Sequence, residues 1–269
     1  MIDAYEGSAE WRQLRPATHK DYKKFLPVWR ERYGDRRVAT IDRAAVFKIR
    51  ARHAETSNRQ GNKAVAVLSA LLSWAVDHGY RTDNPALKPK RLKVSGGYRA
   101  WIDAEIDTFL DKAPAHLKLA CLLALGTGQR GSDLVKMTWA AYRGGEIEVT
   151  QAKTGERVWI PVHGRLAEAL GTRKKTALTI LTTERGRPYS VGWFQHDVSH
   201  AIRDAGLSGV VAHGWRTTAL TWLADAGCSP HQIAAISGHT TLKMIEGYTR
   251  GVNKRELARA AVVKLKGKK

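Results

Sequence analysis

A histidine and a tyrosine stand nine positions apart in the segment SGHTTLKMIEGYTR, residues 237–250. His239 follows a Ser-Gly pair, and Tyr248 follows a Glu-Gly pair. A tyrosine phenol has a pKa of about 10, so at neutral pH it is a poor nucleophile unless a neighbour stabilises its anion or accepts its proton. The pair therefore indicates chemistry only if other parts of the chain supply such groups.

Basic side chains elsewhere in the chain could supply them. Two guanidiniums can bind the non-bridging oxygens of a phosphodiester and stabilise the extra charge of its pentacoordinate transition state. A histidine can accept the phenol proton, and a lysine can protonate the departing sugar oxygen. Arg130 in TGQRGSDL, Lys153 in KTG, and His213 with Arg216 in HGWR have these residue types. Together with His239 and Tyr248 they predict phosphodiester cleavage that uses no metal ion and no cofactor.

Two of these assignments have rivals within the chain. Lys153 occupies a predicted hairpin, but Lys136, Lys174 and Lys175 are alternative basic groups. Tyr189, beside RGRP, is a rival tyrosine, but no box of the kind that surrounds Tyr248 follows it. We therefore assign Lys153 and Tyr248 and keep the alternatives for comparison with the structure.

The remaining histidines and cysteines do not predict a metal site. His196 and His200 are four residues apart on a predicted helix, yet no glutamate completes a His-Glu-x-x-His arrangement, which favours a surface or DNA-facing helix. Cys121 and Cys228 lie far apart and form no CxxC motif, which favours two reduced thiols.

The charge of the chain indicates a polyanionic partner. The 269 residues contain 45 Lys and Arg against 25 Asp and Glu, a formal net charge of +20. Such an excess repels itself unless a polyanion compensates it, and nucleic acid is the leading candidate. No apolar run approaches the roughly 18 residues of a spanning helix, and no signal pattern is present. We expect double-stranded DNA as the partner, no membrane association, and a cytoplasmic, nucleoid-associated protein.

Residues 1–85 predict a small helical domain. THKDYKKFLPVWRERYG has an apolar stripe at helical spacing, formed by Tyr22, Phe25, Leu26 and Trp29. Pro27 is expected to kink or split that helix. TIDRAAVFKIRARHAE and SNRQGNKAVAVLSALLSWAVDHGY predict two more helices, with Thr40 and Ser57 as caps.

Residues 86–97 predict an extended basic linker, because Pro85 just before it, Pro89 and a glycine pair interrupt the periodicity. The first 97 residues and the remainder each carry a net charge of +10, so both parts should contact the polyanion. Basic residues of the first domain and linker are candidates for contacts to DNA phosphates: Arg50, Arg52, Arg59, Lys63, Lys88, Lys90, Arg91 and Lys93.

Residues 98–269 predict a mainly helical second domain with a small β-sheet, an α+β fold. DAEIDTFLDKA and AHLKLACLLALG predict two helices, the second ended by Gly126 and Gly128, and TGQRGSDLVKMTWAAY a third that begins at Arg130. EIEVTQAKTGERVWIPV alternates with period two around Lys-Thr-Gly, which predicts a hairpin. Later helices are predicted at SVGWFQHDVSHAIRDAG, WRTTALTWLADAG, SPHQIAAISG and NKRELARAAVVKLKG.

The chain resembles the tyrosine recombinases of the phage integrase type. TGQRGSDL is similar to the first-arginine box of that family, HGWR to its His-x-x-Arg box, SGH to its second histidine box and GYT to its nucleophile box, in the same order. Where the family commonly has His-x-Leu-Arg-His-Thr, Trp215 takes the Leu position and Thr217 that of the second His. The resemblance implies that Tyr248 is the nucleophile and that the other five candidates assist it.

The resemblance also implies an architecture and a reaction. The first domain would be a helical core-binding, SAM-like domain that clamps duplex DNA together with an integrase-type catalytic domain. Tyr248 would form a 3'-phosphotyrosyl link and free a 5'-hydroxyl. A tetramer would exchange strands through a Holliday junction, with the carboxyl-terminal helix docked on a neighbouring protomer or in cis, and accessory DNA-bending or directionality factors would assist. The expected role is that of a phage or mobile-element integrase. The alternatives are DNA relaxation of the type IB topoisomerase kind and a catalytically silent DNA-binding regulator.

Overall fold

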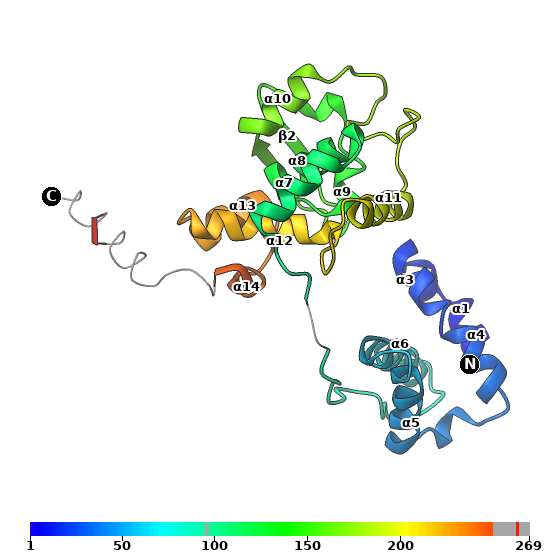
Figure 1. Ribbon diagram of the computed structural model, residues 1–269. Coiled ribbons are helices and arrows are strands. Elements are labelled where there is room, and N and C mark those ends of the chain that lie inside the picture. Colours follow the sequence, from blue (N-terminus) through cyan, green and yellow to red (C-terminus); the bar gives the residue numbers. More distant parts are fainter. Residues whose placement is uncertain (95–96, 250–261, 264–269) are drawn as a thin grey trace. The chain divides into compact units, whose positions relative to one another are not determined.

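The computed structural model describes residues 1–94, 97–249 and 262–263, and the chain divides into two compact units, Met1–Ser95 and Gly96–Lys269. Figure 1 shows that helices dominate both units and that strands occur in the second. Each unit has its own cluster of buried apolar side chains. The predicted fold class, mainly helical with a small sheet, is confirmed.

The first unit consists of helices. They are α1 (Ile2–Glu6), α2 (Ala9–Arg12), α3 (Pro16–Tyr22), α4 (Leu26–Tyr33), the 3₁₀ turn η1 (Val38–Thr40), α5 (Arg43–Ala54) and α6 (Asn58–Asp77). Pro27 lies in the first turn of α4, so the predicted split of the long helix is confirmed. Ser57 caps α6 as predicted, accepting a hydrogen bond from the backbone N–H of Gln60. Thr40 is not a cap, because it ends η1 and Asp42 caps α5 instead.

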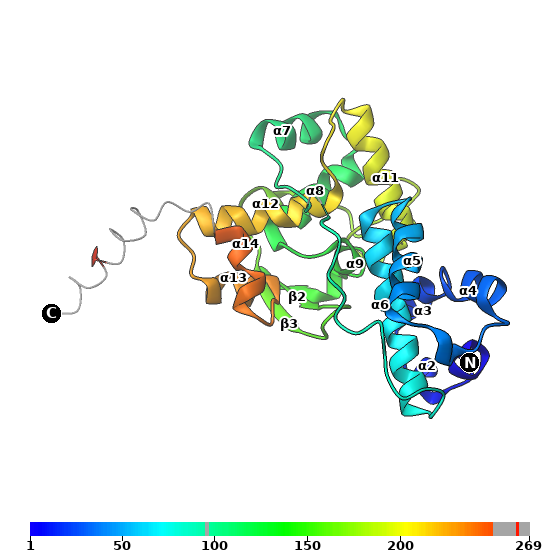
Figure 2. The ribbon, with the colours of Figure 1, turned by 90° about the horizontal axis from the view of Figure 1, so that it is seen from below.

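Helices α5 and α6 pack closely against each other (Figure 2). Gly61 permits the approach, because an added Cβ there would lie 2.8 Å from the carbonyl oxygen of Arg50 and 2.9 Å from the Cβ of Ala54. Val46 from α5 and Leu72 from α6 are fully buried in the shared core. The apolar periodicity of both helices is thus satisfied within the unit.

The segment that follows α6 lies against α5 and α6, although it forms neither helix nor strand up to residue 94. Asn62 exchanges two hydrogen bonds with the backbone of Leu92: its Nδ2 donates at 2.8 Å and its Oδ1 accepts at 2.9 Å. Arg50 Nη1 donates to the carbonyl oxygen of Lys90 at 2.6 Å, and Asn58 Nδ2 to that of Lys93 at 2.8 Å. The predicted linker is therefore tied to the first unit through residue 93.

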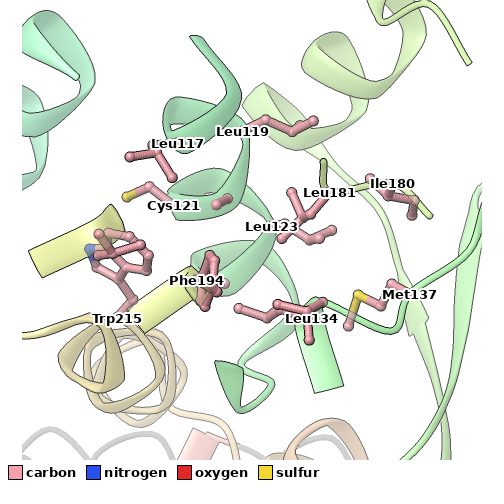
Figure 3. Close-up of a cluster of buried hydrophobic side chains, with 14 of the residues drawn as sticks. Leu117, Leu119, Cys121, Leu123, Leu134, Met137, Ile180, Leu181, Phe194 and Trp215 are labelled. Carbon is pink, nitrogen blue, oxygen red and sulfur yellow. The ribbon is translucent and has the colours of Figure 1, made fainter. Parts of the chain in front are cut away.

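The second unit is built around α8 (Ala115–Thr127), whose apolar residues form much of the core in Figure 3. The other helices are α7 (Asp103–Lys112), α9 (Gly131–Leu134), η2 (Trp139–Ala141), α10 (Gly164–Thr172), α11 (Val191–Asp204), α12 (Ala212–Asp225), α13 (Pro230–Ser237), η3 (Leu242–Met244) and α14 (Glu246–Thr249). Gly126 does not stop α8. It lies inside the helix, at a point where Leu166 leaves no room for a side chain: an added Cβ would meet Leu166 Cδ2 at 2.5 Å. Gly128, at φ 63°, ends the helix.

Three antiparallel strands in the order β1-β2-β3 form the sheet: β1 (Tyr142–Arg143), β2 (Glu146–Thr150) and β3 (Arg157–Pro161). Ile147 pairs with Ile160 and Val149 with Val158, and all four side chains are buried. The predicted hairpin is confirmed, whereas β1 was not predicted. Helix α13 lies beside β3 (Figure 2), which brings the hairpin close to the second histidine box.

Several boundaries differ from the predictions. The helix expected after Arg130 is only the four residues of α9, and α10 and α14 were not predicted. Nearly all of the predicted carboxyl-terminal helix lies outside the described residues.

Both cysteines are free, and Cys121 is buried among apolar side chains in Figure 3, which raises the pKa of its thiol. Among the described residues, no helix is long and apolar enough to span a bilayer.

The contact between Asn62 and Leu92 can be tested by proteolysis. Residues 88–93 contain Lys90, Arg91 and Lys93, all sites for trypsin. We expect Asn62→Ala to accelerate tryptic cleavage in this segment, because both hydrogen bonds that hold Leu92 are lost. Gln60→Ala, on the exposed surface of the same helix, is the control. Equal cleavage rates for Asn62→Ala and wild type would contradict the assignment.

Candidate active site

Arg216 is the most deeply buried of the candidate residues, with 2% of its surface exposed. From α12, its Nη1 donates to the carbonyl oxygen of Gly128 at 2.7 Å and its Nη2 donates to that of Ser237 at 3.0 Å. The pKa of Arg216 is lowered to about 10, chiefly by burial and then by the charge of Arg130. The side chain is still a cation at neutral pH, so this site contains a desolvated positive charge.

His239 lies directly after α13, where Gly238 ends the helix at φ 62°. Its Nε2 accepts a hydrogen bond from Arg216 Nη2 at 3.1 Å. That contact leaves the ring proton on Nδ1, which lies 2.8 Å from Ser237 Oγ. The hydrogen-bond network thus assigns a neutral tautomer in which both ring nitrogens are engaged.

Both candidate histidines face the same three cations: Arg216, Arg130 and Lys153. The pKa of His239 is lowered to about 4, first by burial and then by these charges. The pKa of His213 is lowered by the same causes in the same order. Both imidazoles are therefore neutral at pH 7 in the protein alone, and a neutral imidazole can accept a proton or a hydrogen bond.

His213 occupies the first turn of α12, one turn before Arg216, as the His-x-x-Arg spacing predicted. Its ring packs against the ring of Tyr98, with the centroids 4.8 Å apart. Tyr98 belongs to the segment just before α7, and this segment is anchored to α12 because the N–H of Trp101 donates to Thr218 Oγ1 at 2.7 Å. The start of the second unit therefore covers one side of His213.

Arg130 is the residue before α9, at the predicted loop-to-helix junction. Its Nη1 donates to Gln151 Oε1 at 2.9 Å and lies 4.0 Å from Asp133 Oδ2. Asp133 is 2% exposed, and its Oδ2 has no hydrogen-bond partner among the described residues, while its Oδ1 accepts from the N–H of Ala152 at 2.9 Å. One carboxylate therefore links the Arg130 segment to the hairpin turn.

Lys153 lies in the turn between β2 and β3, and its side chain is exposed. Its charge acts on both candidate histidines. Among the rival lysines, Lys175 packs over the ring of Trp139, with its Nζ 5.4 Å from the ring centroid. The geometry therefore favours Lys153 as the lysine of this site.

Tyr248 lies in α14, and its ring centroid is 5.9 Å from that of His239. Its phenol lies near Arg216 and favours the charged form of that guanidinium. The half-buried ring packs on a small apolar cluster formed by Leu220, Ala224, Ile233 and Ile245. The rival Tyr189 has a different role, because its hydroxyl donates to Asp197 Oδ2 at 2.8 Å. All six candidate side chains thus belong to one neighbourhood of the second unit.

The eight basic candidates of the first unit fall into two groups. Arg50 donates to the Lys90 carbonyl oxygen, and Lys63 pairs with Asp21 at 2.6 Å, so both have partners within the unit. The other six are exposed: Arg52, Arg59, Lys88, Lys90, Arg91 and Lys93.

His196 and His200 are exposed on α11 with their Nε2 atoms 3.0 Å apart. In the described parts of the chain, no three His, Cys, Asp or Glu side chains are grouped to hold a metal ion.

Sequence reasoning missed the polar residues that hold this neighbourhood together, above all Gln129, Asp133 and Gln151. All three are at most 2% exposed. A signal for Gln151 was present in the sequence. Ile147 and Val149 alternate along the inward face of β2, and the next inward position is Gln151, a polar residue where the pattern requires an apolar one.

Residues 102–255 match the model of the phage integrase family. This match covers more than half of the chain, so the chain belongs to the phage integrase family, and the family predicted from the sequence boxes is confirmed. The integrase of Enterobacteria phage 434 is 27% identical over 222 residues, and that of Escherichia phage lambda is 26% identical over 222 residues. Each alignment covers 77% of this chain but 62% of the relative, so the chain spans less than two thirds of either protein.

Solved structures share the fold. A lambda integrase dimer bound to a COC' core site is 25% identical, with a TM-score of 0.79, and the alignment covers 94% of this chain and 77% of that chain. A lambda integrase tetramer bound to a Holliday junction is 23% identical, with a TM-score of 0.76, over 89% of this chain and 76% of that chain. Both likenesses are consistent with the predicted integrase-type fold of the second unit.

The environment of His239 can be tested by titration. We expect the imidazole of the DNA-free protein to remain neutral until the pH approaches 4, because burial and three cations disfavour its protonation. The imidazole proton and nitrogen chemical shifts, followed by NMR from pH 7.5 to 4, report the protonation state, and His239→Gln assigns the signal. A midpoint at or above pH 6.5 would show that the ring does not face these charges.

Proposed function

We propose that this chain is a site-specific DNA recombinase that cuts and rejoins duplex DNA through a 3'-phosphotyrosyl intermediate. The observation that carries the proposal is that the Tyr248 ring lies beside His239, whose Nε2 accepts a hydrogen bond from the buried Arg216 guanidinium. A phosphodiester bound to the same cation would lie within reach of the phenol oxygen.

In this mechanism Arg130 and Arg216 bind the non-bridging oxygens of the scissile phosphate. The two guanidiniums neutralise the charge that builds up as the phosphorus becomes pentacoordinate, and no metal ion is required for that task. The buried hydrogen bonds of Arg216 to carbonyl oxygens fix its orientation before DNA arrives. The polar network is therefore organised in advance for an anion.

The proton transfers are assigned to His213 and Lys153. Tyr248 loses its phenol proton and its oxygen forms a bond to phosphorus, while the bond from phosphorus to the 5' oxygen breaks. His213, neutral at pH 7, takes the phenol proton, and Lys153 gives a proton to the departing 5' oxygen. Both nitrogens of His239 are already engaged, so its role is to orient Arg216 and to contact the phosphate region.

The partners follow from the charge and from the relatives. Duplex DNA is the proposed substrate, supported by the +20 net charge and by the DNA-bound lambda integrase structures. A tetramer on DNA is the proposed assembly, by analogy with the lambda integrase tetramer on a Holliday junction. The first unit would then contact phosphates as a core-binding domain, through its exposed basic residues. Docking of the carboxyl-terminal segment on a neighbouring protomer, assistance from accessory factors and location in the cytoplasm remain proposals.

The phosphotyrosyl intermediate can be tested by covalent capture. The probe is a pool of nicked duplex half-sites with randomised sequence on both sides of the nick. We expect wild type to form an SDS-resistant protein–DNA adduct and Tyr248→Phe to form none while still binding the pool. Tyr189→Phe, which removes a hydroxyl bonded to Asp197, is the matched control and should form the adduct.

The same assay separates the alternatives. If wild type binds the pool and forms no adduct, the chain is a DNA-binding regulator and the proposed mechanism is wrong. Sequencing of captured DNA gives the preferred site. Relaxation of supercoiled plasmids that lack this site, at the rate seen with plasmids that contain it, would instead indicate a topoisomerase.

A further inference from the structure

Gln151 is a buried polar residue at the centre of the candidate site, with 1% of its surface exposed. It directly follows β2, and its backbone closes the hairpin turn. Its N–H donates to the carbonyl oxygen of Glu156 at 2.8 Å, and its own carbonyl oxygen accepts from the N–H of Gly155 at 2.8 Å. Gln151 therefore holds the two ends of the turn that contains Lys153.

The side-chain amide of Gln151 uses its full hydrogen-bonding capacity. Its Nε2 donates to Gln129 Oε1 at 2.7 Å and to the carbonyl oxygen of Ser237 at 2.7 Å. Its Oε1 accepts from Arg130 Nη1 at 2.9 Å and from Thr154 Oγ1 at 3.0 Å. Two donors and two lone pairs are all that a glutamine amide has, so no other residue of this size can replace all four bonds.

The network also fixes which way the amide points. Gln129 Nε2 donates to the carbonyl oxygen of Ile236 at 2.7 Å, which turns Gln129 Oε1 toward Gln151. Only the NH₂ group of Gln151 can meet that oxygen, and its Oε1 must then face the cation of Arg130. The orientation is thus determined by backbone carbonyls at one end and by a guanidinium at the other.

Gln151 connects the two arginines through a shared acceptor. The carbonyl oxygen of Ser237 receives both Gln151 Nε2 and Arg216 Nη2. Gly238 packs directly over the amide, since an added Cβ would lie 2.4 Å from Gln151 Nε2. One amide is therefore hydrogen-bonded to Arg130, to the turn that contains Lys153 and to the chain segment that leads to His239.

We infer that Gln151 is a positioning residue. It holds the Arg130 guanidinium at the distance and orientation from Arg216 at which both guanidiniums can bind one phosphate. The inference rests on the proposed function. Gln151 does not touch the reacting atoms in this account; it acts through Arg130. Loss of the amide would leave Arg130 beside Asp133, whose Oδ2 has no hydrogen-bond partner in the described chain and would draw the guanidinium away from the phosphate.

The kinetic test uses the half-site recovered by covalent capture, under single-turnover conditions with saturating protein. Gln151→Leu is expected to bind this duplex as wild type does and to form the adduct roughly 100-fold more slowly, because Arg130 is misplaced. The isosteric Gln151→Glu should also be slow, since its carboxylate pairs with Arg130 and opposes the phosphate. Gln13→Leu, at an exposed position directly after α2 in the first unit, is the matched control and should react at the wild-type rate.

A neutral substrate distinguishes positioning of Arg130 from a general structural role. A methylphosphonate at the scissile position removes one charged oxygen, so the reaction depends less on a correctly placed guanidinium. We expect the defect of Gln151→Leu to fall below about tenfold on this substrate, like that of Arg130→Ala. The defect of Lys153→Ala should persist, because the leaving group is unchanged. A Gln151→Leu defect of equal size on both substrates, or a wild-type rate on both, would overturn the inference.

The contact itself can be measured without catalysis. In the DNA-free wild type, NMR should show a single arginine side-chain signal for Arg130 with slowed exchange of its guanidinium protons. Gln151→Leu should lose this protection at a temperature well below its own melting temperature, where the variant is still folded. Equal protection in both proteins would overturn the inference even if no adduct forms. Failure of wild type to form the adduct, with Arg130 protected by Gln151, would count against the proposed function and leave the positioning contact standing.

Discussion

The site depends on a guanidinium that is buried before any anion is bound. Arg216 is held by the carbonyl oxygens of Gly128 and Ser237, and its lowered pKa reports the cost of desolvating its charge. Carbonyl dipoles keep a cation in place but do not neutralise it. In the proposed function a phosphodiester supplies the missing negative charge, so the site can be organised in the free protein and still favour an anion. Every other candidate residue is arranged around this cation.

The electrostatic consequences reach both histidines. The cluster of positive charge lowers the pKa of His213 and of His239 and keeps both rings neutral. The same charges would be partly cancelled once a phosphate is bound, so the imidazoles become better bases when substrate is present. In the proposed mechanism, binding and proton transfer are therefore coupled through Arg216, and the positive charge serves both steps.

The sequence identified the residues that the second unit brings together better than it identified the framework that holds them. Arg130, Arg216 and Tyr248 were recognisable because their types and order resemble the boxes of the family, and the long periodic helices were recognisable from their apolar stripes. Asp42 caps α5 instead of Thr40, a difference of two residues that local propensity does not resolve. Gly126 lies inside α8, where Leu166, distant in sequence, leaves no space for a side chain, and a periodic pattern does not reveal that such a glycine serves a tertiary contact and does not end the helix. Helices as short as α9 and α14 have too few residues for any periodicity to register.

The central claim is that Arg130 and Arg216 bind one phosphate within reach of Tyr248. A crystal structure of the protein with a nicked half-site and orthovanadate, which mimics the pentacoordinate phosphorus, tests it most directly. The account predicts vanadium bonded to the Tyr248 oxygen, with equatorial oxygens accepting hydrogen bonds from both guanidiniums. Vanadate bound to the tyrosine with neither arginine in contact, or bound elsewhere, would contradict it.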